Sequence, residues 1–539
     1  MTNTLTQLAS RLKVGVTPQA LPIPGTNQVE NSAGGYSFPV NDWTRLQRFL
    51  ILGSEGGSYY ASEQKLSADN ANGVLNCIQN DGPRVVREIV AVSKAGRAPK
   101  NDPALFALAL CASLGDIETR RLALDALPEV ARTGTHLFHF AAFCDGARGW
   151  GRGLRRAVGR WYETMGAEKL AYQALKYQSR DGWSHRDLLR LSHPKPGSQA
   201  HGILYHWMTQ GWPGVGDEPH DVEALRQIWA FERAKRAGTE DEIVGLIRDY
   251  KLPREGIPTQ FLTSPKVWEA LLEDMPLAAM VRNLATMTKI ELLTRTSDAT
   301  KRVVSMLNDS DRIRRARLHP IALLSALTTY SSGRGVKGNA TWTAVPKVID
   351  ALDSAFYTAF GALEPTNKRW ALALDVSGSM GGPPIAGVAG LTPRVASAAM
   401  AMVTNAVEDD VQMLAFSHEL RTLSLSRKQR LDDVLKAVDK IPMGATDCAL
   451  PMLWASKTKA KVDVFVVYTD SETWFGNIHP VEALRRYREE SGIAAKLIVV
   501  GMVANKFSIA DPNDAGMLDV VGFDTAAPQL MSDFSLNNM

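Results

Sequence analysis

The apolar pattern of this chain changes once, near Lys368, and that change limits the fold more than any other feature. From about Asn41 to Phe360, segments of helix length carry apolar residues at helical spacing, separated by Gly, Pro, Asp or Asn. Beyond Lys368, apolar runs of strand length alternate with helical runs, a pattern typical of a parallel sheet covered on both faces. We therefore predict a multidomain chain, with all-α repeats over residues 20–366 and a doubly wound, Rossmann-like α/β domain over residues 367–539.

The first part has the pattern of stacked helix pairs. Residues 83–95 place apolar side chains on one helix face, and Asp102-Pro103 then has the composition of a new helix start. The same succession of helix and turn continues to about Phe360, with almost no strand-like alternation. The pattern favours HEAT-like or armadillo-like repeats, although no fixed repeat motif is visible.

In the second part, polar residues follow the expected strands, which are residues 371–376, 411–416, 461–470 and 495–504. Ligands of doubly wound sheets lie beyond the carboxyl ends of the strands. The oxygen-bearing residues at or near those ends are Asp375, Ser377 and Ser379 after the first strand, Thr446 in an intervening loop, and Asp470 after a later strand. Two carboxylates and three hydroxyls form an oxygen ligand set suited to a hard cation.

This D-x-S-x-S, Thr, Asp set resembles the metal-ion-dependent adhesion site (MIDAS) of von Willebrand factor A domains. The resemblance implies that Ser377, Ser379 and Thr446 are direct ligands, with Asp375 and Asp470 direct or acting through water. We expect one divalent ion, Mg²⁺ before Ca²⁺ or Mn²⁺. The alternative is that Asp375 and its serines only cap a helix or end a strand. A D-x-D phosphatase, a dinucleotide site and a P-loop are each disfavoured, because their motifs are absent.

Composition places further limits on the class of protein. The cysteines Cys77, Cys111, Cys144 and Cys448 never form a C-x-x-C pair, which argues against a zinc module or a disulfide framework. The N-terminus lacks the apolar core of a signal peptide, and no window approaches the length of a membrane span. We therefore expect a cytoplasmic protein without a membrane partner.

Charge is distributed unevenly along the chain. From Lys368 onward there are 17 Lys and Arg against 20 Asp and Glu, so that of the totals of 61 and 57 the first part holds 44 against 37. The excess gathers between Arg148 and Lys195, with eleven basic and four acidic residues. Such a concentration of positive charge attracts a polyphosphate backbone, and the alternative is a solvated helix face.

The most unusual segment lies within this basic stretch, over residues 176–195. Ser184, with Asp187 three residues later, predicts the start of a helix at His185. The basic candidates for contact with RNA in this segment are Lys176, Arg180, His185, Arg186, Arg190, His193 and Lys195. Arginine binds phosphate in a bidentate manner and histidine can hydrogen-bond phosphate or base edges. A lone histidine on a helix is more often a structural residue.

Several blocks together resemble the Ro autoantigen family, the sixty-kilodalton SS-A/Ro ribonucleoproteins and their bacterial orthologues. They are FLILGSEGGSYYASEQKL (49–66), KYQSRDGWSHRDLLRLSHPKP (176–196), DVSGSM, GATDCALPM and VVYTDSETW. The resemblance implies a TROVE-type helical body closed into a ring, followed by a von Willebrand factor A domain. It also implies that Y RNA binds a basic outer surface, and that the central hole admits single-stranded 3′ ends of defective RNA. Lys176, Arg180 and His193 match the family's Y RNA positions.

We therefore predict a non-catalytic, monomeric RNA-binding scaffold in RNA quality control and the stress response. The family further implies that the RNA tethers an exoribonuclease such as polynucleotide phosphorylase. One alternative is a metal-dependent protein-adhesion scaffold with no primary RNA role. Another is a metal-dependent ribonuclease, for which the sequence offers too few carboxylates to hold a second metal ion.

Overall fold

A computed structural model describes residues 16–212, 223–335, 339–361, 363–385, 388 and 391–538. The chain forms two compact units, which we call the helical unit (residues 74–359) and the α/β unit (residues up to 73 together with residues from 360). Among the described residues, no helix has the length and apolar character needed to cross a membrane.

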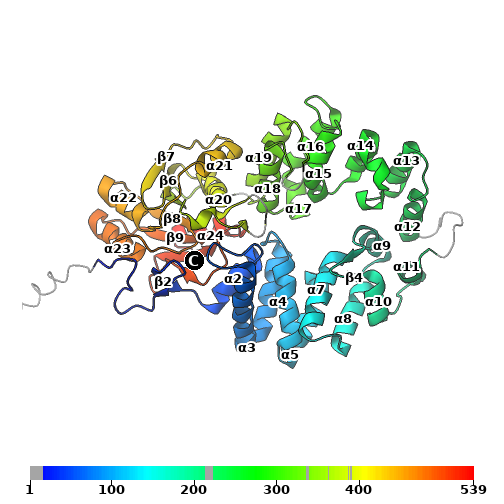
Figure 1. Cartoon of the computed structure of the whole chain (residues 1–539), viewed down its shortest axis with the longest axis horizontal. Helices are drawn as coiled ribbons and strands as arrows, with labels where there is room; N and C mark the ends of the chain where they lie inside the picture. Colours follow the sequence, from blue (N-terminus) through cyan, green and yellow to red (C-terminus); the bar gives the residue numbers. More distant parts are fainter. Residues whose placement is uncertain are drawn as a thin grey trace, which may run out of the picture. The chain divides into compact units, whose positions relative to one another are not determined.

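The helical unit consists of short helices in succession, drawn from blue through green in Figure 1. Its helices are the later part of α3 (Glu63–Ala95), α4 (Asp102–Leu114), α5 (Ile117–Asp125), α6 (Leu127–Val130), α7 (Gly134–Ala147), α8 (Arg152–Glu163), α9 (Ala167–Lys176), α10 (His185–Ser192), α11 (Gln199–Gln210), α12 (Glu223–Ala234), α13 (Glu240–Tyr250), the 3₁₀ helices η1 (Arg254–Gly256) and η2 (Thr259–Thr263), α14 (Pro265–Asp274), α15 (Leu277–Lys289), α16 (Asp298–Asn308), α17 (Ser310–Ala316), α18 (Pro320–Ser331) and α19 (Pro346–Thr358). Two short strands, β3 (Ser179–Arg180) and β4 (Trp183–Ser184), form a hairpin before α10.

Local sequence signals set many of these helix boundaries. Thr133, Ser198, Thr239 and Ser264 each accept a hydrogen bond from a backbone N–H in the first turn of the helix that follows. Within α3, Asp81 leaves the helical conformation with φ −158° and ψ 80°, and its carboxylate accepts from the Arg84 N–H at 2.9 Å. A new helical run therefore starts next to Pro83, as the pattern of residues 83–95 predicts.

The α/β unit contains the strands β1 (Val29–Glu30), β2 (Tyr36–Pro39), β5 (Arg369–Asp375), β6 (Asp410–Phe416), β7 (Leu420–Leu423), β8 (Val464–Thr469), β9 (Lys496–Gly501), β10 (Phe507–Ser508) and β11 (Met517–Val521), and the helices α2 (Asp42–Leu52), η3 (Ser379–Gly381), α20 (Pro393–Val407), α21 (Leu431–Asp439), α22 (Leu450–Thr458), α23 (Pro480–Ser491) and α24 (Ala527–Ser535), with the start of α3. The main sheet has the order β11-β9-β8-β5-β6-β7. Its pairs are parallel except for β7, which returns antiparallel beside β6.

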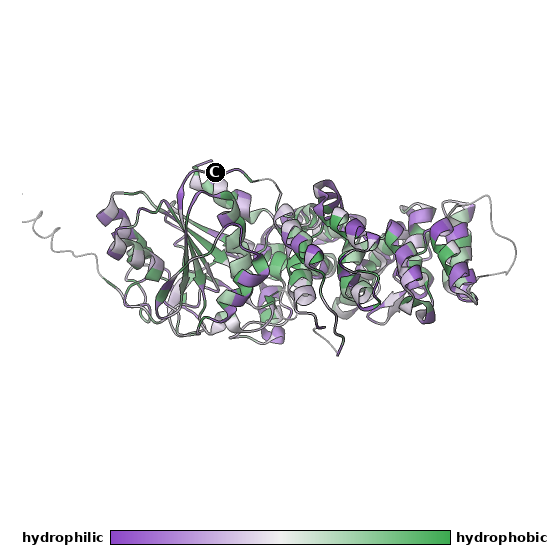
Figure 2. Ribbon diagram, turned by 90° about the horizontal axis from the view of Figure 1, so that it is seen from above, coloured by the Kyte–Doolittle hydropathy of each residue, from purple (hydrophilic) through white to green (hydrophobic). Residues whose placement is uncertain are grey.

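The central strands of this sheet are buried along nearly their whole length. Every residue of β8 is buried, and Figure 2 shows the strands of the sheet as hydrophobic ribbons between helices. Continuous apolar runs of this kind are expected where helices cover both faces of a parallel sheet. The four predicted strands are confirmed as β5, β6, β8 and β9, and the predicted fold classes of both parts are confirmed; closure of the repeats into a ring remains a prediction.

The N-terminal segment belongs to the α/β unit, which the sequence pattern does not reveal. Strand β2 pairs antiparallel with both β1 and β10, far apart in the sequence. Arg48 of α2 is fully buried, and its guanidinium donates to both carboxylate oxygens of Asp519 at 2.7 and 2.8 Å. The boundary predicted at residue 367 coincides with the approach to β5, but the compact unit also takes in residues before 74.

Candidate functional site

The basic segment of the helical unit is organised by a hairpin and a capped helix. Between β3 and β4, Asp181 and Gly182 both have positive φ, at 52° and 79°, which is the geometry of a tight two-residue hairpin turn. Ser184 then caps α10, since its hydroxyl accepts from the Asp187 N–H while the Asp187 carboxylate accepts from the Ser184 N–H at 3.0 Å. The predicted helix start at His185 is confirmed.

The exposed cations of this segment lie on the hairpin, on α10 and just after it. Arg180, Arg186, Arg190, His193 and Lys195 are all exposed. Among the described residues, only Arg180 has a carboxylate nearby, that of Asp181 at 3.7 Å, and Asp181 also pairs with His139. We define Arg180, Arg186, Arg190, His193 and Lys195 as the basic surface.

Helix α8 packs against α10 and extends the supply of positive charge. Arg152, Arg155 and Arg156 are exposed, whereas Leu154 and Trp161 of the same helix are buried. The helix is therefore amphipathic, with its apolar side in the core. Positive charge on adjacent helices that lacks internal partners is available to a phosphate backbone.

His185 does not belong to this surface, and its predicted contact with RNA is wrong. Its side chain is only 4% exposed, the Tyr162 hydroxyl is 2.8 Å from its Nδ1, and the Phe138 ring lies edge-on at 4.8 Å. Burial lowers the pKa of His185 to about 4. The residue is a neutral core histidine, because the first position of α10 points its ring inward with the leucines.

This burial predicts a loss of stability in acid. The pKa of His185 falls from 6.5 in an unfolded chain to about 4 in the fold, so the unfolded state binds a proton first as the pH drops. Stability should fall between pH 6.5 and pH 4, by up to about 3 kcal/mol. Urea unfolding followed by tryptophan fluorescence at pH 7 and pH 4.5 measures this, and His185→Gln should remove most of the difference. His206→Gln, at an exposed histidine of α11, is the control and should leave the pH dependence unchanged.

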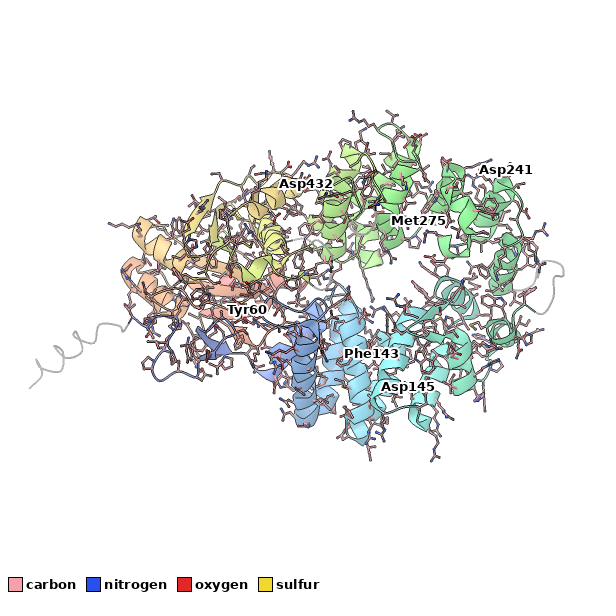
Figure 3. The ribbon with its side chains drawn as sticks, viewed as in Figure 1. Tyr60, Phe143, Asp145, Asp241, Met275 and Asp432 are labelled. Carbon is pink, nitrogen blue, oxygen red and sulfur yellow. The ribbon has the colours of Figure 1, made fainter. Side chains whose placement is uncertain are left out.

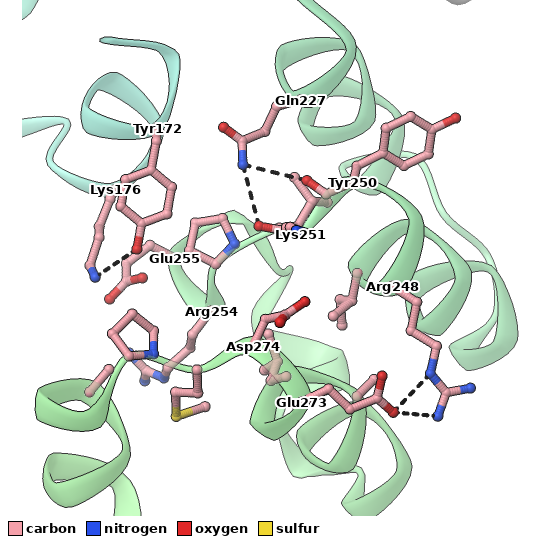
Figure 4. A pocket seen from close by; sticks show the side chains of 18 of the residues that line it. Tyr172, Lys176, Gln227, Arg248, Tyr250, Lys251, Arg254, Glu255, Glu273 and Asp274 are labelled. Atoms are coloured by element: carbon pink, nitrogen blue, oxygen red, sulfur yellow. Dashed lines mark hydrogen bonds and ion pairs between the residues drawn. The ribbon is translucent and has the colours of Figure 1, made fainter. Parts of the chain in front are cut away.

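Lys176 lies in a different setting from the basic surface. Its Nζ donates to the Tyr172 hydroxyl at 3.0 Å and lies over the Tyr172 and Tyr177 rings, 5.2 and 5.6 Å from their centroids. It lines a cavity of about 800 Å³ with residues of α9, α13 and α14, shown in Figure 4. Lys176 is therefore half-buried and faces a hollow that also contains acidic residues such as Glu255 and Asp274.

The five predicted metal ligands lie at one end of the α/β sheet. Asp375 ends β5, Ser377 and Ser379 follow it, Thr446 lies between α21 and α22, and Asp470 follows β8. Neighbouring strands β5 and β8 are parallel, so their carboxyl ends meet at the same edge. All five side chains are at most 5% exposed.

Hydrogen bonds hold these loops together. The Asp375 carboxylate accepts from the Ser377 N–H at 2.9 Å and from the Thr469 hydroxyl at 2.6 Å. The Ser377 and Ser379 hydroxyl oxygens are 3.2 Å apart, and the Gly378 N–H donates to the Gly444 carbonyl at 3.1 Å. The D-x-S-x-S loop and the loop of Thr446 are therefore joined beside the strand ends.

The charges at this site are poorly balanced without a cation. Burial raises the pKa of Asp470 well above its usual range, and the nearby carboxylates of Asp375 and Glu472 raise it further. Burial likewise raises the pKa of Asp375, and the Arg394 charge offsets this only in part. Among the described residues, no group of three or more His, Cys, Asp or Glu converges as a metal site. The donor set therefore fits a hard cation held by hydroxyls and two carboxylates, with no thiolate or imidazole ligand.

Comparison with known proteins identifies the family. The Ro60 vWA domain model matches residues 369–535, and the TROVE domain model matches residues 29–210 and 249–329. The chain is 44% identical to the RNA-binding protein RO60 of Deinococcus radiodurans, covering 94% of this chain and 95% of the relative. The chain belongs to the Ro60 family. It is also 39% identical to the RNA-binding protein RO60 of Caenorhabditis elegans, covering 94% of this chain and 90% of the relative.

A solved Ro60 relative has the same fold. The crystal structure of the Deinococcus radiodurans RO (RSR) protein matches with a TM-score of 0.70 and 43% sequence identity, covering 93% of this chain and all of that one. The relatives named above are RNA-binding proteins, which supports an RNA-binding role for this member of the Ro60 family.

Two residues near the cation site of this Ro60 protein escaped the sequence analysis. Tyr60, labelled in Figure 3, comes from the loop between α2 and α3, and its hydroxyl hydrogen-bonds Ser379. Burial raises the pKa of Tyr60, as do the charges of Asp470 and Glu472. Glu472 accepts from the Ser32 N–H at 2.6 Å. The glycine-rich run before Tyr60 marks a loop, but only the fold brings that loop to the sheet edge.

Proposed function

We propose that this Ro60 protein binds small noncoding RNA of the Y type through the basic surface, as a non-catalytic scaffold in RNA quality control. The observation that carries the proposal is the set of exposed cations on the hairpin and α10 that have few carboxylate partners of their own. Arginine side chains held on a helix can each hydrogen-bond a backbone phosphate. The RNA-binding relatives support the same class of ligand.

The wider proposal is that single-stranded 3′ ends of misfolded or damaged RNA are a second ligand, and that bound RNA recruits an exoribonuclease such as polynucleotide phosphorylase. Lys176 stays a proposed RNA contact on the strength of the family resemblance. Its half-buried place against Tyr172 means that RNA reaches it only by entering the adjoining cavity. The cytoplasm remains the expected compartment.

The test of Y RNA binding is a charge-matched comparison. Arg180→Gln, Arg186→Gln and Arg190→Gln together should flatten the dependence of log affinity on log salt by about two to three units, close to one for each phosphate lost. Electrophoretic mobility shifts with a small hairpin RNA at several salt concentrations measure the slope.

The control removes three positive charges from elsewhere in the helical unit. Arg233, Arg248 and Arg314 are exposed and pair with Glu242, Glu273 and Asp311 respectively, so their replacement by Gln should change the slope by less than one unit. An equal loss in both variants would reduce the basic surface to general electrostatics, and an unchanged slope in the first would refute the proposal.

We further propose that Asp375, Ser377, Ser379, Thr446 and Asp470 hold one divalent ion, with Mg²⁺ expected. The uncompensated buried carboxylates support this assignment. The same observation favours the second candidate function, a metal-dependent protein-adhesion scaffold. That alternative gains if Ser377→Ala abolishes partner binding while the arginine variants leave RNA binding intact.

A further inference from the structure

A second large cavity of the helical unit has an unusual charge. It measures about 640 Å³ and lies among the end of α3, the start of α7, α15 and the junction of α17 and α18. Arg132, Arg282 and Arg317 line it, together with His136 and His319. No Asp or Glu is among the described residues that line it, in contrast to the cavity of Lys176.

The three arginines lack carboxylate partners among the described residues. Arg132 donates to the Ser93 hydroxyl at 2.7 Å, and Arg282 donates to the Ala278 carbonyl at 3.1 Å. Glu129, three residues before Arg132, pairs with Lys94 at 2.6 Å instead. Burial lowers the pKa of Arg132, and so does the charge of Arg317. Like charges are thus held close together with nothing negative between them.

A polar group in the cavity wall also lacks a partner. The Nδ1 atom of His136 is buried and has no hydrogen-bond partner among the described residues. Burial lowers the pKa of His136 to about 3, and the Arg132 charge acts in the same direction, so the ring is neutral near pH 7. Buried polar atoms are usually paired, and one beside three cations suits a ligand that can exchange a hydrogen bond as well as accept charge.

The rest of the wall is apolar. Val281, Leu284 and Leu318 are each under 10% exposed and line the cavity, whereas Arg282 and Arg317 are exposed. A cavity of this size accommodates a small organic group. A nucleobase can enter it only when the base is unpaired, and three arginines exceed the charge of one phosphodiester, so they suit successive phosphates of a strand.

We propose that this cavity binds an unpaired segment of RNA, with one base against the apolar wall and neighbouring phosphates on Arg132, Arg282 and Arg317. The inference rests on the proposed function in that the ligand is RNA, but it concerns a surface separate in sequence from the basic surface. It assigns the single-stranded ligand to named residues, which neither the basic surface nor the metal centre does.

The test uses the full chain and a fluorescein-labelled ten-nucleotide oligouridine, with binding followed by fluorescence anisotropy. The variant Arg282→Gln with Arg317→Asn changes only exposed side chains, and asparagine tolerates the left-handed backbone of Arg317, whose φ is 48°. We expect at least about tenfold weaker binding at 0.1 M salt, from two lost charged hydrogen bonds. The salt slope should also fall by about 1.4, or 0.7 for each phosphate of a single strand.

The matched control is Arg312→Gln with Arg315→Gln, which removes the same charge from α17 at residues that do not line the cavity. The control should bind oligouridine within about twofold of the wild type. Competition by uridine monophosphate and by a phosphoserine peptide identifies the source of the phosphate. We expect unlabelled oligouridine to displace the probe far better than either competitor.

Each other outcome overturns a definite statement. Equal losses in variant and control, or no loss in the variant, overturn this inference while hairpin binding keeps the proposed function. Displacement by the phosphopeptide at lower concentration than by oligouridine would make the cavity a protein-recognition site. Displacement by uridine monophosphate as strong as by oligouridine would make it a site for free nucleotides. A wild-type chain that binds neither oligouridine nor hairpin RNA would refute the proposed function itself.

Discussion

Replacing Arg48 by Met is expected to destabilise the α/β unit by about 3–5 kcal/mol, because it leaves a charge without its partner inside the fold. The Arg48 side chain is 1% exposed and that of Asp519 is 14% exposed. The guanidinium also donates to the Phe507 carbonyl at 2.8 Å and to the Asn505 side-chain oxygen at 2.9 Å. Removing it therefore strands a carboxylate and at least two oxygen acceptors together.

Thermal and urea unfolding of the full chain measure this loss. Arg486→Met is the control, since Arg486 is exposed and pairs with Glu490 within α23, and should cost less than about 1 kcal/mol. The double variant Arg48→Met with Asp519→Leu should regain part of the stability, because no unpaired charge remains. A loss below about 1 kcal/mol for Arg48→Met alone would show that the N-terminal segment contributes little to the unit.

The second large effect is expected at the proposed cation site, where Asp470→Asn should act in opposite directions with and without metal. Without divalent ions, the variant should be at least as stable as the wild type, because it removes a buried charge next to Asp375 and Glu472. With Mg²⁺, the wild type should gain about 2.7 kcal/mol at a hundred times its dissociation constant. The variant should gain almost nothing, since loss of a ligand is expected to weaken Mg²⁺ binding at least about a hundredfold.

The metal effect should also depend on pH. The pKa of Asp470 is raised above the 3.8 of an unfolded chain, so the metal-free fold binds its proton more tightly than the unfolded chain does. The penalty for ionising the site grows as the pH rises from about 3.8 through the raised pKa and is absent below that window. Stabilisation by Mg²⁺ should therefore be larger at pH 8 than at pH 5.

Calorimetric titration with MgCl₂ and thermal unfolding with EDTA or Mg²⁺ measure both effects. Asp433→Asn, at an exposed residue of α21, controls for loss of one negative charge and should respond to Mg²⁺ like the wild type. If wild type and Asp470→Asn gain equally from Mg²⁺, the metal assignment is refuted.

Local patterns in the sequence determined the elements and the order of the candidate site. Ser184 and Asp187 predict the cap of α10 because all its atoms lie within one turn. Asp375 and Asp470 were placed together because parallel strands end at the same edge of a sheet. The exposure of Arg186 and Arg190 likewise agrees with their helical spacing opposite the buried leucines.

Only the tertiary structure decided which side chains are accessible and which distant segments meet. His185 lies between two exposed residues in sequence but is buried, because Trp161 and Tyr162 of another helix pack around it. Arg48 and Asp519 are separated by 471 residues, and no local periodicity encodes such a pair. Periodicity records which face of an element is apolar, whereas the partner of that face depends on long-range packing, which a single sequence does not specify at the level of individual contacts.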